Sequence, residues 1–83
     1  MSNQKFAAVT GANRGIGRVT AISLAKQGWS IAVIGRDAAG IDAVAQEIGS
    51  AAIAVQCDVS DRASVASAFA SIKTTFGRLD LLF

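Results

Sequence analysis

The most informative segment of this chain is Thr10-Gly11-Ala12-Asn13-Arg14-Gly15-Ile16-Gly17, a glycine-rich turn. It follows a continuous apolar run at residues 6–10, which is typical of a strand buried on both faces. A helical pattern over residues 16–27 comes next, and we expect it to end at Gly28. The segment therefore joins a buried strand to a helix.

The glycines have the spacing G-x-x-x-G-x-G, which differs from the general dinucleotide pattern G-x-G-x-x-G. The physics is similar, because Gly11 permits a tight turn, Gly15 lets a ligand approach the backbone, and Gly17 lets the helix pack closely. Free N–H groups and the positive dipole end at the helix start favour an anion. The segment predicts a phosphate-binding loop, and the alternative is a structural turn without a ligand.

The rest of the chain repeats the strand-then-helix pattern. Further strands are expected at short apolar runs, over residues 29–34, 52–55 and 79–83. Asp37 is the expected N-cap of a second helix that ends at Gly49, and Ser60 that of a third helix that ends at Gly77. The order β-α-β-α-β-α-β predicts an α/β fold with a parallel sheet and right-handed crossovers.

Composition excludes several classes of protein. With 52% apolar and 17% charged residues, the chain is not a disordered tail. Its net charge is only +2 and its basic residues are scattered along the sequence, which does not favour nucleic-acid binding. It has no histidine and one cysteine, so a zinc site or a histidine triad cannot be built. The single cysteine suits a reducing compartment, and residues 1–5 form no signal peptide. We therefore expect a cytoplasmic protein without a membrane span or a metal site.

Residues 10–17 resemble the cofactor motif of the short-chain dehydrogenase/reductase (SDR) family. Asp58-Val59 resembles its adenine-contacting segment, and Phe-Gly-Arg-Leu-Asp-Leu-Leu at 76–82 resembles the stretch before its Asn-Asn-Ala-Gly motif. The resemblance covers residues 5–83. It implies a Rossmann-type, doubly wound parallel sheet, of which this chain is the first half, with NAD(P) as cofactor. It also implies hydride transfer between nicotinamide and a small-molecule carbonyl or alcohol.

The resemblance assigns contacts along the cofactor. Gly11, Gly15 and Gly17 would shape the diphosphate site, and the backbone N–H of Ile16 would meet the diphosphate. Asn13 would reach a phosphate oxygen or an oxygen of the adenosine ribose.

At the adenine, Asp58 would accept a hydrogen bond from the amino group, and the backbone of Val59 would support the ring. The alternative for Asp58 is a turn residue before the third helix. For Cys57 beside it the sequence shows no environment that would support a redox or nucleophilic role, so we expect a small buried side chain.

The end of the second expected strand distinguishes NADP from NAD. An acid there binds the ribose 2′-OH, whereas an arginine accommodates a 2′-phosphate. In this family the acid would occupy position 35, but this chain has Gly35 followed by Arg36, and Arg14 can approach the same phosphate. Paired guanidinium groups predict NADP(H), with NAD as the less favoured cofactor. The alternatives are that Arg36 is a solvated loop charge and that Asp37 contacts the ribose.

The catalytic groups of the family are a Tyr, a Lys, a Ser and an Asn, and its Tyr-x-x-x-Lys pair lies well downstream of the fourth strand. This sequence has no tyrosine, so no catalytic residue is assigned in it. The apolar run at 79–83 would leave an unpaired sheet edge. We therefore expect residues 1–83 to be the cofactor-binding portion of a longer reductase, which we expect to be a homo-oligomer.

Two alternatives remain open. The chain could be a non-catalytic nucleotide-binding module or an inactive remnant, in which case it binds nucleotide without hydride transfer. A flavodoxin-like signalling domain would share the β-α-β order, but it would carry an acidic cluster after the first strand, where this chain has Gly-Ala-Asn-Arg-Gly at 11–15.

Overall fold

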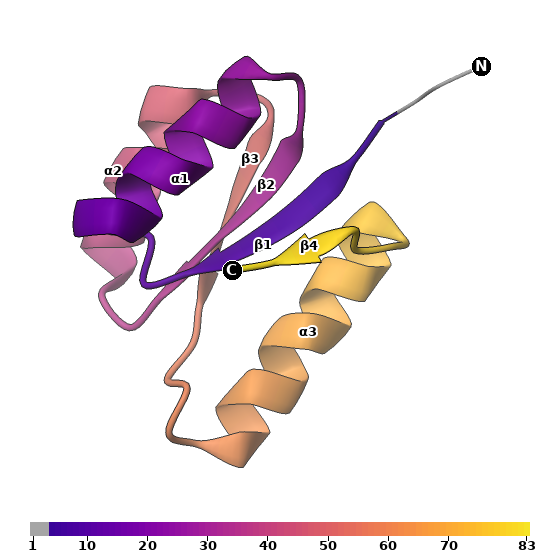
Figure 1. Ribbon diagram of the computed structural model, residues 1–83. Helices are drawn as coiled ribbons and strands as arrows, with labels where there is room; N and C mark the ends of the chain where they lie inside the picture. Colours follow the sequence, from indigo (N-terminus) through magenta and orange to yellow (C-terminus); the bar gives the residue numbers. More distant parts are fainter. Residues whose placement is uncertain (1–3) are drawn as a thin grey trace.

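The computed structural model describes residues 4–83 as a four-stranded parallel sheet with helices on both faces (Figure 1). The elements follow in the order β1 (Phe6–Thr10), α1 (Gly15–Lys26), β2 (Ser30–Gly35), α2 (Ala38–Ile48), β3 (Ala52–Gln56), α3 (Arg62–Phe76) and β4 (Leu81–Leu82). Residues 1–3, part of the N-terminal segment read above as lacking a signal peptide, lie outside the described residues.

The strand order is β3-β2-β1-β4, so the chain winds outward on one side of β1 and then crosses to the other side. This reversal makes the sheet doubly wound, and ligands of such sheets bind at the carboxyl ends of the strands near the reversal. The predicted α/β class, with its parallel strands and alternating helices, is confirmed.

Two apolar clusters hold the layers together, because successive residues of a strand face opposite sides of the sheet. In Figure 1, α1 and α2 lie on one side of the sheet and α3 on the other. On the first side the fully buried strand residues are Ala7, Val9, Ile31 and Val33. On the second side α3 packs through Ala68 and Ile72 on the intervening strand residues Ala8, Ala32 and Ile34, with Cys57 buried among them.

The N-terminus of α3 differs from the prediction. Asp61, not Ser60, is the N-cap, and its carboxylate accepts hydrogen bonds from the backbone N–H of Ala63 (3.0 Å) and of Ser64 (3.5 Å). The prediction of Ser60 was wrong because its hydroxyl is already engaged, donating to the Asp58 carboxylate at 2.6 Å. Both residue types cap helices, so only the competing partner separates them.

Other boundaries move by one or two residues. The helix expected from residue 16 begins at Gly15, and the strands expected at 29–34 and 52–55 end at Gly35 and Gln56. Asp37 is the N-cap residue of α2 as predicted, but its side chain makes no capping hydrogen bond.

The fourth strand is shorter than the expected 79–83. Before it, the bonds between Asp80 and Phe6 are mixed. The Asp80 backbone N–H donates to the Phe6 carbonyl at 2.8 Å, whereas the Phe6 N–H donates to the Asp80 carboxylate at 2.9 Å, and that carboxylate also pairs with Arg78 at 2.6 Å. After it, pairing with β1 continues, because Phe83 N–H donates to Ala8 and its carbonyl accepts from Thr10, both at 2.9 Å. The side chains of residues 81–83 are all exposed.

Among residues 4–83, no helix is both long enough and apolar enough to cross a membrane.

Candidate functional site

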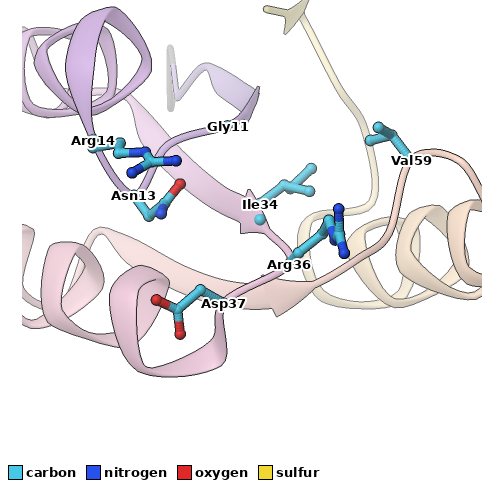
Figure 2. A pocket seen from close by; sticks show the side chains of 8 residues that line it. Gly11, Asn13, Arg14, Ile34, Arg36, Asp37 and Val59 are labelled. Carbon is cyan, nitrogen blue, oxygen red and sulfur yellow. The ribbon is translucent and has the colours of Figure 1, made fainter.

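An open pocket of about 520 Å³ lies where β1 and β2 end (Figure 2). Three segments supply its wall: the glycine-rich turn, the end of β2 with the start of α2, and the loop after β3. The lining residues are Gly11, Asn13, Arg14, Ile34, Gly35, Arg36, Asp37 and Val59. The pocket therefore lies at the carboxyl edge of the sheet, where α/β folds bind their ligands.

The glycine-rich turn is anchored to the neighbouring strand. The backbone N–H of Ala12 donates to the carbonyl of Ile34 at 3.1 Å, and the Ala12 side chain is fully buried. The glycine-rich turn is thereby held against the carboxyl end of β2, which forms part of the pocket wall. This bond fixes the backbone of residues 11–13 relative to Gly35 and Arg36.

Glycine is required at positions 11, 15 and 17 of the turn for different physical reasons. Gly11 and Gly15 have φ of +60° and +64°, where residues with a Cβ are strained. Gly17 has an ordinary φ, but a Cβ there would overlap the Gly11 carbonyl oxygen and lie 3.1 Å from the Thr10 carbonyl oxygen. The start of α1 therefore rests directly on the end of β1, which requires glycine at position 17.

The start of α1 fits an anionic group. Arg14 is the N-cap residue, and its side chain makes no hydrogen bond to the first turn of the helix. The first-turn N–H groups of a helix have no partners within the helix and carry its positive dipole end. With Gly11 and Gly15 free of neighbouring atoms where a Cβ would stand, a phosphate can approach this backbone closely.

Arg14 and Arg36 give the pocket its charge. Both are exposed, and Figure 2 shows them entering from different segments, the glycine-rich turn and the residue after β2. The ion pairs found within residues 4–83 involve other arginines, Arg18 with Glu47 and Arg78 with Asp80. Both pocket guanidinium groups are therefore available to an anionic ligand.

Asp37 is the one acidic residue on the wall of the pocket. Figure 2 shows its carboxylate turned toward α2 and away from the Arg36 guanidinium. A Cβ at Gly40, in the first turn of α2, would lie 3.0 Å from Asp37 Oδ2, which places the carboxylate against that turn. The pocket thus presents two guanidinium groups, with its carboxylate set against the helix.

Asp58 lies beside the pocket but is not part of its wall. Its carboxylate accepts hydrogen bonds from the Ser60 hydroxyl (2.6 Å) and the Ser60 backbone N–H (3.0 Å). These bonds, followed by the charge of Arg36, lower the pKa of Asp58 below its ordinary value. The turn role that the sequence left as an alternative is therefore present, while the next residue, Val59, is exposed on the wall of the pocket.

The structure brings most of the expected cofactor residues together. Those on the wall are Gly11, Asn13, Arg14, Arg36 and Val59. The others stand behind or beside it: Gly15, Ile16, Gly17 and Asp58. Sequence reasoning missed Ile34, which it took for an ordinary strand residue, although its position at the carboxyl end of a central strand was a usable signal.

A doubly wound parallel sheet with a glycine-rich turn at the carboxyl end of its first strand defines a Rossmann-type protein. The model of the short chain dehydrogenase family matches residues 5–83, and the chain belongs to that family. The resemblance noted from the sequence is thereby confirmed. Members of the family are oxidoreductases that bind NAD(P) and act on small molecules.

Individual relatives agree with this assignment. The chain is 38% identical to a 3beta-hydroxysteroid dehydrogenase of Mediterraneibacter gnavus, over 95% of this chain and 30% of the relative. A 3-ketoacyl-(acyl-carrier-protein) reductase from Brucella melitensis, solved with NADH, superposes with a TM-score of 0.92 at 42% identity, covering 94% of this chain and 32% of that one.

An NADPH dependent reductase involved in bacilysin biosynthesis superposes with a TM-score of 0.91 at 33% identity, covering 96% of this chain and 36% of that one. The chain spans about a third of the length of the curated relatives it matches.

Proposed function

We propose that this chain is the cofactor-binding part of an NADP(H)-dependent oxidoreductase that interconverts a small-molecule carbonyl and alcohol. The observation that carries the proposal is the pocket wall at the end of β2, where Gly35 and Arg36 stand together and Arg14 lines the same pocket. The fold and the family support a nicotinamide dinucleotide as the ligand.

The residues of the pocket fit such a cofactor. Gly11, Gly15 and Gly17, with the backbone N–H of Ile16, would hold the diphosphate at the start of α1. Asn13 would contact a phosphate or the adenosine ribose from the wall of the pocket. When bound, the cofactor supplies or accepts the hydride.

The adenine end of the cofactor would lie toward the loop after β3. The exposed Val59 would support the ring, and Asp58 would accept from the adenine amino group. The Asp58 carboxylate is ionised at neutral pH and therefore an acceptor, and its hydrogen bonds from Ser60 lower its pKa further.

Electrostatics supports NADP(H) over NAD(H). A 2′-phosphate adds two negative charges close to the ribose, and charge-assisted bonds from guanidinium groups are about twice as strong as neutral ones. Arg14 and Arg36 can supply such bonds, and Gly35 places no carboxylate against them. One structural relative was solved with NADH and another is described as NADPH dependent, so the preference rests on these residues.

Hydride transfer in this family needs a tyrosine, and the sequence has none. We propose that the catalytic groups belong to the part of a longer protein that corresponds to the other two thirds of the relatives. For that protein we propose the cytoplasm, because one cysteine suits a reducing compartment, and a homo-oligomer, as the family resemblance implies.

Arg36→Ala tests the cofactor preference. We expect the variant to bind NADPH about 10- to 100-fold more weakly, because one or two charge-assisted bonds are lost. Its binding of NADH should weaken less than about threefold, because NADH has no 2′-phosphate. Dissociation constants come from titrating each reduced cofactor by its fluorescence. Arg18→Ala is the matched control, since Arg18 pairs with Glu47 outside the pocket. Equal losses for both cofactors would overturn the assignment.

A further inference from the structure

We propose that Ile41 is a specificity-determining residue, because its buried side chain keeps position 35 a glycine and so keeps a carboxylate away from the ribose end of the pocket. This inference rests on the proposed function, in which Gly35 places no carboxylate near the NADP(H) phosphate.

The backbone of Gly35 does not itself require glycine. Gly35 is the last residue of β2, pairs with Gln56 of β3 and accepts a hydrogen bond from the Cys57 N–H at 2.9 Å. The glycines with positive φ in this structure are at other positions, so Gly35 has a conformation open to any residue. The reason for glycine must therefore lie in its surroundings.

The surrounding atom that matters belongs to α2. A Cβ at position 35 would lie 2.7 Å from Cγ2 of Ile41, far inside van der Waals contact. Ile41 is only 1% exposed and packs in the same apolar cluster as Val33 and Val44. Its Cγ2 methyl is attached directly to Cβ, and a β-branched side chain in a helix has one strongly preferred rotamer. Relieving the clash therefore requires Ile41 to leave its preferred rotamer or α2 and β2 to move apart.

A Cβ at position 35 would also lie close to the wall of the pocket. The same Cβ would stand 3.7 Å from Oδ1 of Asn13, another residue of the pocket wall. A longer side chain at position 35 would thus extend along the wall between Asn13 and α2, one residue from Arg36. An aspartate there would repel a 2′-phosphate and accept from a ribose hydroxyl. Ile41, which is not part of the pocket wall, would prevent this from behind it.

The test is to place Asp at position 35 with and without the methyl branch of Ile41. Ile41→Leu removes the branch on Cβ and keeps the number of carbons, whereas Ile41→Val keeps the branch and removes the terminal methyl. We expect Gly35→Asp alone to lower the melting temperature, G35D/I41L to recover most of that loss, and G35D/I41V to recover little. Each double variant is compared with its own Ile41 single variant, which cancels the cost of changing the core.

Cofactor binding is the second readout. Relative to I41L alone, G35D/I41L should shift the ratio of NADPH to NADH dissociation constants at least about tenfold toward NADH, because a carboxylate then faces the 2′-phosphate. A carboxylate at position 35 that points away from the ribose end of the pocket would leave this ratio unchanged, and the proposed link between position 35 and cofactor choice would then be wrong. If Gly35→Asp fails to fold, Gly35→Ala replaces it in the melting series, since alanine carries the same Cβ without charge.

The outcomes separate the two proposals. Equal recovery by leucine and valine, or a Gly35→Asp variant that melts like the parent and already prefers NADH, would overturn the role of Ile41. A parent protein with no preference for NADPH would overturn the proposed NADP(H) specificity, while the melting series would still decide whether Ile41 excludes a side chain at position 35.

Discussion

Gly17→Ala is expected to destabilise the protein, although alanine is the better helix former. Gly17 is the third residue of α1, and on helix propensity alone the change would add about 1 kcal/mol of stability. In the folded protein the new Cβ would overlap the Gly11 carbonyl oxygen and lie 2.9 Å from the carbonyl carbon of Gly11 and 3.1 Å from the oxygen of Thr10. Every one of these atoms is backbone, so α1 has to move away from β1.

The magnitude follows from setting the two effects against each other. Forcing an extra methyl group into a packed site costs about 1–3 kcal/mol, and contacts with backbone atoms place this case at the upper end. After subtracting about 1 kcal/mol of helix propensity, the free energy of unfolding should fall by about 2 kcal/mol. For a chain of this length, that corresponds to a melting temperature lower by about 8–16 °C. The same displacement moves Gly11, so NADPH binding should weaken as well.

Urea denaturation followed by circular dichroism measures the effect, with titration of NADPH as a second assay. Ser23→Ala is the control, because Ser23 is an exposed position of the same helix, where alanine should be neutral or add up to about 0.5 kcal/mol. If Gly17→Ala stabilised the protein as Ser23→Ala is expected to, the close packing of α1 on the glycine-rich turn would be refuted.

Two further predictions concern stability. Asp61→Ala removes the N-cap bonds of α3 and should lower the free energy of unfolding by about 1 kcal/mol, whereas Ser60→Ala should change it by less than about 0.5 kcal/mol. Urea denaturation measures both, and a larger effect of Ser60→Ala than of Asp61→Ala would contradict the observed cap. The pKa of Asp80 is lowered, first by its hydrogen bond from Arg78 and then by the Phe6 N–H, so its ionised form stabilises the fold. That stabilisation is present above a pH of about 4 and is lost as the pH falls through the lower folded-state pKa. Asp80→Asn should therefore weaken the fall in melting temperature on the acid side of a plot against pH. A plot unchanged by the substitution would show that the ionised Asp80 does not stabilise the fold.

The order of the elements was predictable because it is encoded in local patterns. A continuous apolar run marks β1, and apolar residues at helical spacing such as Ile41 and Val44 mark α2. Gly77, which ends α3 in the left-handed conformation, is a local signal of the same kind. Each pattern involves residues within a few positions of one another, so no knowledge of the rest of the chain is needed.

Features that depend on competition between neighbours were harder to predict. Ser60 and Asp61 both suit an N-cap, and the hydrogen bond from Ser60 to Asp58 removes one of them. Similarly, the Phe6 N–H bonds the Asp80 side chain in place of a backbone carbonyl, although the Asp80 N–H still bonds the Phe6 carbonyl. Strand β4 therefore begins at Leu81, later than its apolar pattern suggests. In both cases the residue types were right and the choice of partner was not visible in the sequence.

The candidate site also has features that local sequence predicts and features that depend on contacts between distant segments. The spacing of Gly11, Gly15 and Gly17 after a strand already predicted an anion-binding turn, because conformational freedom and the free N–H groups of a helix start are local properties. That Arg14 and Arg36 line one pocket depends on β2 lying beside β1 with their carboxyl ends aligned.

Gly35 shows most clearly what sequence patterns alone do not explain. From the sequence it is a position without a carboxylate, and nothing nearby in the chain explains why. In the folded protein the Cγ2 methyl of Ile41 occupies the space that its Cβ would need. Local sequence patterns determine which residues can form a strand, a turn or a helix. Close packing between elements determines which side chains there is room for, and that depends on how α2 folds back over β2, which only the tertiary structure defines.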